Sequence, residues 1–207
     1  MSSSSVVTPI RAGSRRLAFF PERLEAMKIF GICGRNGAGR GDLVSELVAR
    51  LRMEGLRVSI VKRAPPAFDV DTAGTDSWNQ RQAGCREMII ASDRRAVIFD
   101  EFEPDSASPD LGSLIARLRP CDIVLAINFR DAPVPRIEVW DGSSGAEPPR
   151  RNAEFVVANA TPRRTGSATW IALDDYDSMA ALILSSAGRA VGTAPGAGTN
   201  AVSRSVR

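Results

Sequence analysis

Apolar and polar residues form two kinds of pattern along the central part of the chain, short apolar runs and apolar residues at helical spacing. The run MKIFGICG, which begins at Met27, is short and apolar, and it predicts a buried strand followed by a tight turn. From Asp42 onward, leucines recur at every fourth position from 43 to 51. This spacing predicts a helix that buries its leucine face.

The same two kinds of pattern continue to about residue 187. Apolar runs predict further strands over 56–63, 94–102, 121–129, 135–140 and 154–160. Helices are predicted over 77–92, 108–118 and 174–187. The first of these begins at Ser77, because Ser77 and Gln80 have the spacing of a capping box. Strands that alternate with helices are typical of an α/β fold with a largely parallel sheet.

Length and composition favour a single folded domain with two tails. The chain has 207 residues, 43% of them hydrophobic, which suffices for one sizeable core. Residues 1–26 and 188–207 show no sustained periodicity and have little to bury. We therefore expect a flexible N-terminal extension at 1–26, a domain at 27–187 and a disordered tail at 188–207.

The positive charge of the chain lies in these tails. Residues 1–26 carry a net +2 and residues 188–207 a net +3, so the formal +3 leaves about −2 for the domain. Since the domain is not basic, it lacks the main electrostatic attraction to nucleic acid, and we expect no such partner. The sequence has neither a run of eighteen apolar residues nor a secretory signal pattern, so we expect a cytoplasmic protein without a membrane partner.

The composition excludes much enzyme chemistry. The chain has no histidine, and so it lacks the commonest general base and every Ser-His or Cys-His nucleophile. Its three cysteines are widely spaced, which leaves neither a disulfide framework nor a C-x-x-C metal site. No catalytic residue is predicted.

A glycine-rich stretch, GICGRNGAGRGD at residues 31–42, joins the first strand to the first helix. Gly34 and Gly39 match the phosphate-binding template G-x-x-x-x-G-K-[ST], but Arg40 replaces the lysine and Gly41 replaces the serine or threonine. Glycines at a helix N-terminus still offer backbone N–H groups and a partial positive charge to an anion. Hydrolysis is disfavoured, because a guanidinium is not equivalent to lysine and Gly41 has no oxygen for a metal.

Two other interpretations of this stretch remain open. The first is a dinucleotide-binding turn, although the glycine spacing departs from G-x-G-x-x-G. Lys62 and Arg63 end the second strand, and such a basic pair would suit a 2′-phosphate. The second is a strand-to-helix turn that binds no ligand.

The order of several segments from residue 27 to about 187 resembles the MobB family, the molybdopterin-guanine dinucleotide biosynthesis accessory protein B. The resemblance rests on segments 27–64, 68–92, 114–130 and 134–139, and its strongest block is DVDTAGTDSWNQRQAG. It implies a P-loop NTPase-like three-layer α/β domain that is usually dimeric and binds GTP. Members of the family are thought to assist the guanylyltransferase that attaches GMP to molybdopterin.

The resemblance also implies where ligands bind. The expected nucleotide contacts are Gly34, Arg35, Asn36, Gly37, Ala38, Gly39, Arg40, Gly41, Asp42 and Lys62. Asp69 and Asp71 are expected either to bind Mg²⁺ or to form a turn. Arg81 and Arg86, on the helix that begins at Ser77, are expected to face phosphate or solvent.

The departures from the family pattern fall on functional positions. Besides Arg40 and Gly41, the histidines usual after the second strand are absent. The Glu-Gly-Phe-Lys motif of the family reads Ile-Asn-Phe-Arg at 127–130, which removes an acid expected near metal and phosphate. These losses favour a protein that is at most a weak GTPase.

Three hypotheses follow. The first is an accessory protein of molybdenum cofactor biosynthesis, a homodimer that binds GTP weakly, with or without Mg²⁺, and assists the molybdopterin guanylyltransferase. The second is a nucleotide-free scaffold that has kept only a surface for a partner protein. A third, less favoured interpretation is an NADP-binding oxidoreductase.

Overall fold

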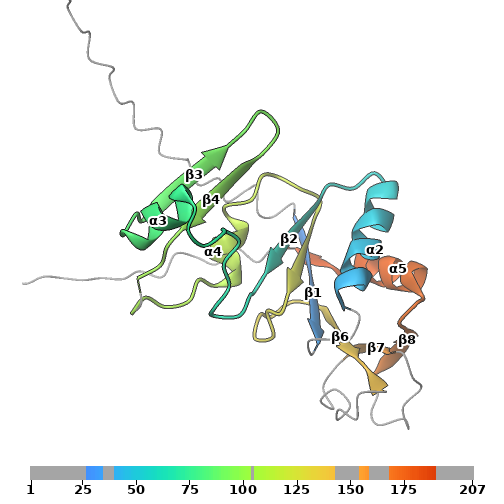
Figure 1. The fold of residues 1–207 in the computed structure, drawn as a ribbon. Helices are drawn as coiled ribbons and strands as arrows, with labels where there is room; N and C mark the ends of the chain where they lie inside the picture. Colours follow the sequence, from blue (N-terminus) through green and yellow to red (C-terminus); the bar gives the residue numbers. More distant parts are fainter. Residues whose placement is uncertain (1–26, 35–39, 104, 143–153, 159–167, 190–207) are drawn as a thin grey trace, which may run out of the picture.

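The structure is a computed structural model that describes residues 27–34, 40–103, 105–142, 154–158 and 168–189. The predicted extension and all but two residues of the predicted tail lie outside these ranges. Within them, the chain forms a large, mostly parallel sheet with helices on both faces, and a small sheet beside it (Figure 1).

The large sheet has the strand order β2-β5-β1-β6-β7-β8. Its strands are β1 (Lys28–Gly34), β2 (Val58–Lys62), β5 (Ile123–Ile127), β6 (Arg136–Trp140), β7 (Phe155–Ala158), β8 (Thr169–Ala172) and β9 (Gly188–Arg189). Neighbours along this order are parallel, whereas β9 pairs antiparallel with the start of β1. The predicted α/β domain with a largely parallel sheet is confirmed.

Strands β8 and β9 were not predicted. The first spans four residues, and the second spans only two and has no apolar side chain. Because β9 hydrogen-bonds to β1, the folded domain extends two residues beyond the predicted boundary at residue 187.

Helices cover both faces of the large sheet. They are α2 (Arg40–Met53) and α5 (Tyr176–Ser186) on one face and α4 (Leu111–Ile115) on the other (Figure 1). Phe30 and Ile32 of β1 pack with α2 and α5, while Ile29 packs with α4, because successive side chains of a strand point to opposite faces. The leucines of α2 at 43, 47 and 51 lie in the first core, as predicted. The three layers are those of the predicted fold.

The small sheet is an antiparallel hairpin of β3 (Glu87–Ala91) and β4 (Ala96–Asp100), and α3 (Asp76–Gln82) precedes it. The predicted helix over 77–92 is therefore wrong beyond residue 82. Gly84 has a φ of 99°, a conformation that ends helices. The apolar run after it pairs with β4, and periodicity alone does not separate a short buried helix from a strand.

The helices α3 and α4 have N-caps other than the predicted ones. For α3 the cap is Thr75, whose hydroxyl oxygen accepts a hydrogen bond from the Trp78 N–H at 3.3 Å. Ser77, the predicted cap, lies in the first turn, and its hydroxyl donates to Asp71. For α4 the cap is Asp110, so this helix begins three residues later than predicted.

No helix in the described ranges is long and apolar enough to cross a membrane.

Candidate functional site

Ligands of open parallel α/β sheets bind at the carboxyl edge, where the strands end. At this edge β1 ends at Gly34 and α2 begins at Arg40, so the glycine-rich stretch leads from a strand into a helix. Among the predicted nucleotide contacts, the structure describes Gly34, Gly41, Asp42 and Lys62, together with the backbone of Arg40. The others, Arg35, Asn36, Gly37, Ala38 and Gly39, lie outside the described residues.

Gly34 packs directly against β6. A Cβ atom at this position would lie 2.7 Å from the backbone oxygen of Val139 and 3.0 Å from its Cβ. Both distances are too short for a side chain without a shift of β6. Gly41 differs, because a Cβ there would meet no atom within 4 Å. Packing against β6 therefore requires glycine at position 34, whereas position 41 has room for a larger residue.

A guanidinium reaches the end of β1 from the segment after β5. Arg130 Nη2 donates to the carbonyl oxygen of Gly34 at 3.0 Å, and Arg130 Nη1 lies 3.6 Å from Glu138 Oε2. The same carboxylate lies 3.4 Å from Arg136 Nε. The Arg130 side chain is about half exposed, so part of its charge faces solvent beside the glycine-rich stretch. Arg130 was not among the predicted contacts, although the topology points to it, since β1 and β5 are parallel neighbours.

Two more cationic residues lie at the end of β2. Lys62 is its last residue and is exposed, and Arg63 follows it. The Arg63 N–H donates to the carbonyl oxygen of Ile127 at 2.9 Å, and its guanidinium lies 4.8 Å from the centre of the Phe129 ring. Together with Arg130, these side chains give the carboxyl edge a positive character that suits an anion.

Asn128 shapes the turn that carries Arg130. Its φ is 66°, and its backbone N–H donates to the carbonyl oxygen of Ile32 at 3.1 Å. Asparagine tolerates this left-handed region better than most residues other than glycine. The glycine that the family resemblance implies here is therefore replaced without loss of the turn.

The described residues do not fit a magnesium ion beside the glycine-rich stretch. Gly41 has no side-chain oxygen, and Asp42 is exposed in the first turn of α2. Asp69 and Asp71, the predicted metal ligands, both contact Arg81, whose Nη1 lies 3.0 Å from Asp69 Oδ1 and 3.3 Å from Asp71 Oδ2. Within the described ranges, no group of three or more His, Cys, Asp or Glu side chains is arranged to hold a metal ion.

Arg81 faces neither phosphate nor solvent, and the prediction for it is wrong. Its side chain is only 8% exposed. Besides its two bonds to Asp69 and its bond to Asp71, it donates from Nε to Glu101 Oε1 at 2.7 Å, and its guanidinium lies 4.4 Å from the centre of the Phe99 ring. Its role is to join the segment after β2 to the end of β4.

The ionisation of these groups follows from their contacts. Hydrogen bonds from Arg81 lower the pKa of Asp69, and the same bonds raise the pKa of Arg81. For Asp71, partial burial acts to raise the pKa, but hydrogen bonds from Ser77, Thr72, Thr75 and Arg81 outweigh burial and lower it. All three side chains are therefore charged at neutral pH.

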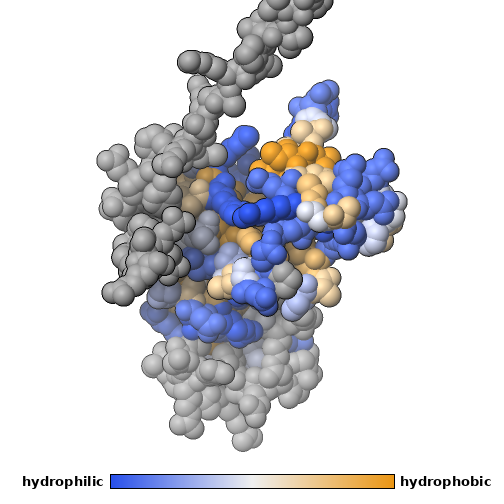
Figure 2. All heavy atoms as spheres, turned by 90° about the vertical axis from the view of Figure 1, so that its left-hand side faces the viewer, coloured by the Kyte–Doolittle hydropathy of each residue, from blue (hydrophilic) through white to orange (hydrophobic). Residues whose placement is uncertain are grey.

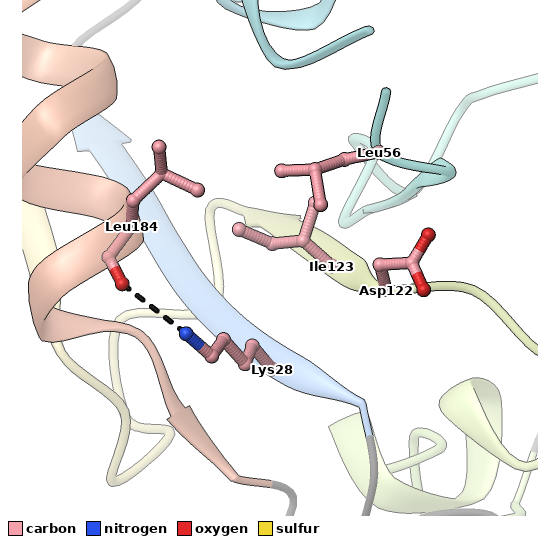
Figure 3. A pocket seen from close by; sticks show the side chains of 5 residues that line it. All are labelled: Lys28, Leu56, Asp122, Ile123 and Leu184. Carbon is pink, nitrogen blue, oxygen red and sulfur yellow. Dashed lines mark hydrogen bonds between the residues drawn. The ribbon is translucent and has the colours of Figure 1, made fainter. Parts of the chain in front are cut away.

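A small hollow lies at the opposite, amino edge of the sheet. It is lined by Lys28, Leu56, Asp122, Ile123 and Leu184 (Figure 3). The Lys28 Nζ donates to the carbonyl oxygen of Leu184 at 3.2 Å, and the Asp122 carboxylate is bonded to Arg57. Both charged groups of the hollow are already paired within the chain, so it is a poor candidate for a ligand site.

Comparison with known proteins shows which family this chain is similar to. The MobB family model, described as molybdopterin guanine dinucleotide synthesis protein B, matches residues 29–162. A molybdopterin-guanine dinucleotide biosynthesis adapter protein of Haemophilus influenzae is 32% identical over 133 residues, 64% of this chain and 74% of that protein. The adapter protein of the same name from Escherichia coli is 30% identical over 115 residues, 55% of this chain and 65% of that protein.

Solved structures agree on the fold. The crystal structure of Bacillus subtilis MobB matches 77% of this chain and 98% of its own, with a TM-score of 0.61 and 17% identity. A crystal structure of molybdopterin-guanine biosynthesis protein B matches 76% of this chain and 98% of its own, with a TM-score of 0.56 and 24% identity. These likenesses confirm the predicted P-loop NTPase-like α/β fold. Since the family model spans more than half of the sequence, this chain belongs to the MobB family.

Proposed function

We propose that this chain is an accessory protein of molybdopterin guanine dinucleotide biosynthesis, which binds GTP weakly and assists a molybdopterin guanylyltransferase in the cytoplasm. Two relatives are named adapter proteins of this pathway, and family membership supports a shared role. The name adapter describes a protein that acts through a partner, which agrees with a chain that has no histidine and no predicted catalytic residue.

The observation that carries the nucleotide part of this proposal is the carboxyl edge of β1. The strand ends at a glycine packed on β6, the helix α2 begins six residues later, and Arg130 donates to the carbonyl oxygen of Gly34. A helix N-terminus attracts an anion through its N–H groups, and a guanidinium at the end of the preceding strand adds positive charge. The phosphates of GTP are the ligand that this combination favours.

Turnover of GTP is not part of the proposal. Phosphoryl transfer relies on positioned charge, chiefly from the loop lysine and from a magnesium ion held by a serine or threonine. Here Arg40 and Gly41 stand at those positions, and the carboxylates of Asp69 and Asp71, the expected metal ligands, are bonded to Arg81. We expect a binding protein rather than a GTPase.

Titration calorimetry with GTP tests the proposal on the full chain. We expect the wild type to bind with a Kd below ~1 mM, that is, more strongly than about 4 kcal/mol. The variant Arg130→Gln should bind about tenfold more weakly, since it removes a charge worth ~1.4 kcal/mol at the phosphate. Arg52→Gln, at the far end of α2, should bind like the wild type. Absence of saturable binding by the wild type would favour the nucleotide-free scaffold.

We also propose that the chain forms a homodimer, and the β3–β4 hairpin supports this second part of the proposal. Ile89 and Ile98 face each other across the hairpin and are 63% and 62% exposed, and Ile90 and Val97 on its other face are each 41% exposed. Figure 2 views the molecule from the hairpin side and shows apolar side chains gathered there among hydrophilic ones. A two-stranded sheet with apolar residues exposed on both faces is marginally stable alone and favours a protein partner.

A further inference from the structure

The segment after β2 holds two carboxylates that converge on a single nitrogen atom. Arg81 Nη1 lies 3.0 Å from Asp69 Oδ1 and 3.3 Å from Asp71 Oδ2, and Arg81 Nη2 lies 3.1 Å from Asp69 Oδ2. Two hydroxyls bond to the other carboxylate oxygen of Asp71, since Thr75 Oγ1 and Ser77 Oγ lie 3.2 Å and 3.1 Å from Asp71 Oδ1. Carboxylate oxygens that converge on one point are ligands that Mg²⁺ and Mn²⁺ prefer.

The cation at that point is part of the chain. Asp71 is 11% exposed and Arg81 is 8% exposed, so water screens this pair poorly. The third contact of the guanidinium, Nε to Glu101 at 2.7 Å, and the Phe99 ring at 4.4 Å hold it on the β4 side as well. A guanidinium that bonds to three carboxylates and lies against an aromatic ring has little freedom to move aside for a metal ion.

We propose that Arg81 is the built-in counterion of Asp69 and Asp71, that it occupies the position a divalent cation would otherwise take, and that the segment after β2 therefore binds no metal. The proposal goes beyond GTP binding, because it concerns the free chain and holds whether or not a nucleotide binds. Arg81 acts here as a positioning residue, since it fixes the carboxylates and joins them to the end of β4.

Electron paramagnetic resonance of free Mn²⁺ tests this proposal on the full chain without nucleotide. We expect the wild type to leave the free Mn²⁺ signal unchanged up to millimolar concentration. Arg81→Met, which removes the charge but keeps a long side chain, should gain Mn²⁺ binding, and the added substitution Asp71→Asn should remove it again. Arg86→Met is the matched control, because Arg86 is an exposed arginine near the same hairpin, and this variant should behave like the wild type.

Two results would overturn the proposal. One is Mn²⁺ binding by the wild type that Asp71→Asn abolishes, which would make the segment a metal site. The other is a folded Arg81→Met variant that binds no Mn²⁺, since Arg81 would then not be what excludes the metal.

If Arg81→Met does not fold, the wild-type titration still decides the first point. Arg81→Lys then decides the second, because one ammonium cannot fill the place of the forked guanidinium and Mn²⁺ should raise the Tm of this variant only.

Discussion

At the scale of single residues, Gly34 and Gly41 provide a matched test of which glycines the fold requires. Gly34→Ala brings a methyl group to 2.7 Å from the backbone of β6, and overpacking of this kind costs about 2 kcal/mol of unfolding free energy. Gly41→Ala enters open space in the first turn of α2 and should gain up to about 1 kcal/mol from helix propensity. Urea unfolding of both variants measures the difference. Equal stability of Gly34→Ala and the wild type would contradict the close packing.

The sequence did not distinguish these two glycines. Both occur in one stretch, Gly34 at the first glycine of the phosphate-binding pattern and Gly41 at its serine or threonine position. The two glycines differ because β6, a strand far along the chain, packs against Gly34 and not against Gly41. A local sequence pattern does not show such a contact. The same holds for Arg81, whose three carboxylate partners come from two separate segments, so that sequence alone left it between phosphate and solvent.

At the scale of elements, Arg57 and Asp122 join the amino ends of β2 and β5. The Arg57 N–H and Nε donate to Asp122 Oδ2 at 2.7 Å and 3.0 Å, and Nη2 donates to Oδ1 at 2.8 Å. In return, the Asp122 N–H donates to the carbonyl oxygen of Arg57 at 2.9 Å. The hydrogen bonds from Arg57 lower the pKa of Asp122 from 3.8 to about 2.

This pKa predicts a pH-dependent stability. A carboxyl group whose pKa is lower in the folded state stabilises the fold above its unfolded pKa, and this stabilisation is lost as the pH falls from about 4 to about 2. Asp122→Asn should therefore lower the Tm at pH 7, and the gap to the wild type should close between pH 4 and pH 2. Asp93→Asn, on an exposed residue of the hairpin turn, serves as the control for thermal unfolding. A gap that persists at pH 2 would exclude the ionised pair as its cause.

Helices and strands with a regular pattern of apolar residues were predicted well. Strands that form only through pairing with a neighbouring strand were not. The leucines of α2 predict a helix with one buried face, and the apolar run of β5 predicts a strand. Both elements are present near the predicted bounds. The sequence pattern predicts a helix where β3 lies, because the strand depends on pairing with β4 rather than on its own pattern. The short β8 and β9 likewise exist through their neighbours β7 and β1.

At the scale of the whole molecule, the large sheet is covered on both faces and the hairpin is not. The core residues of the large sheet are buried by α2, α5 and α4, whereas the described part of the chain leaves four large aliphatic side chains of the hairpin exposed. Strands β3 and β4 also pair only with each other among the described residues. A second copy of the chain packed on the hairpin would cover the face that carries Ile89 and Ile98.

The variant Ile98→Lys tests this arrangement through the oligomeric state. In a two-fold dimer each substitution occurs twice, and Ile98 lies directly opposite Ile89 on one face of the hairpin, so two ammonium groups would be brought into the same apolar interface. We expect sedimentation velocity to show a dimer for the wild type and a monomer for Ile98→Lys. Met53→Lys is the control, because Met53 is 84% exposed at the end of α2, outside the hairpin, and should leave the dimer intact. A wild-type monomer, or an Ile98→Lys dimer, would show that the hairpin is not the surface that joins two copies.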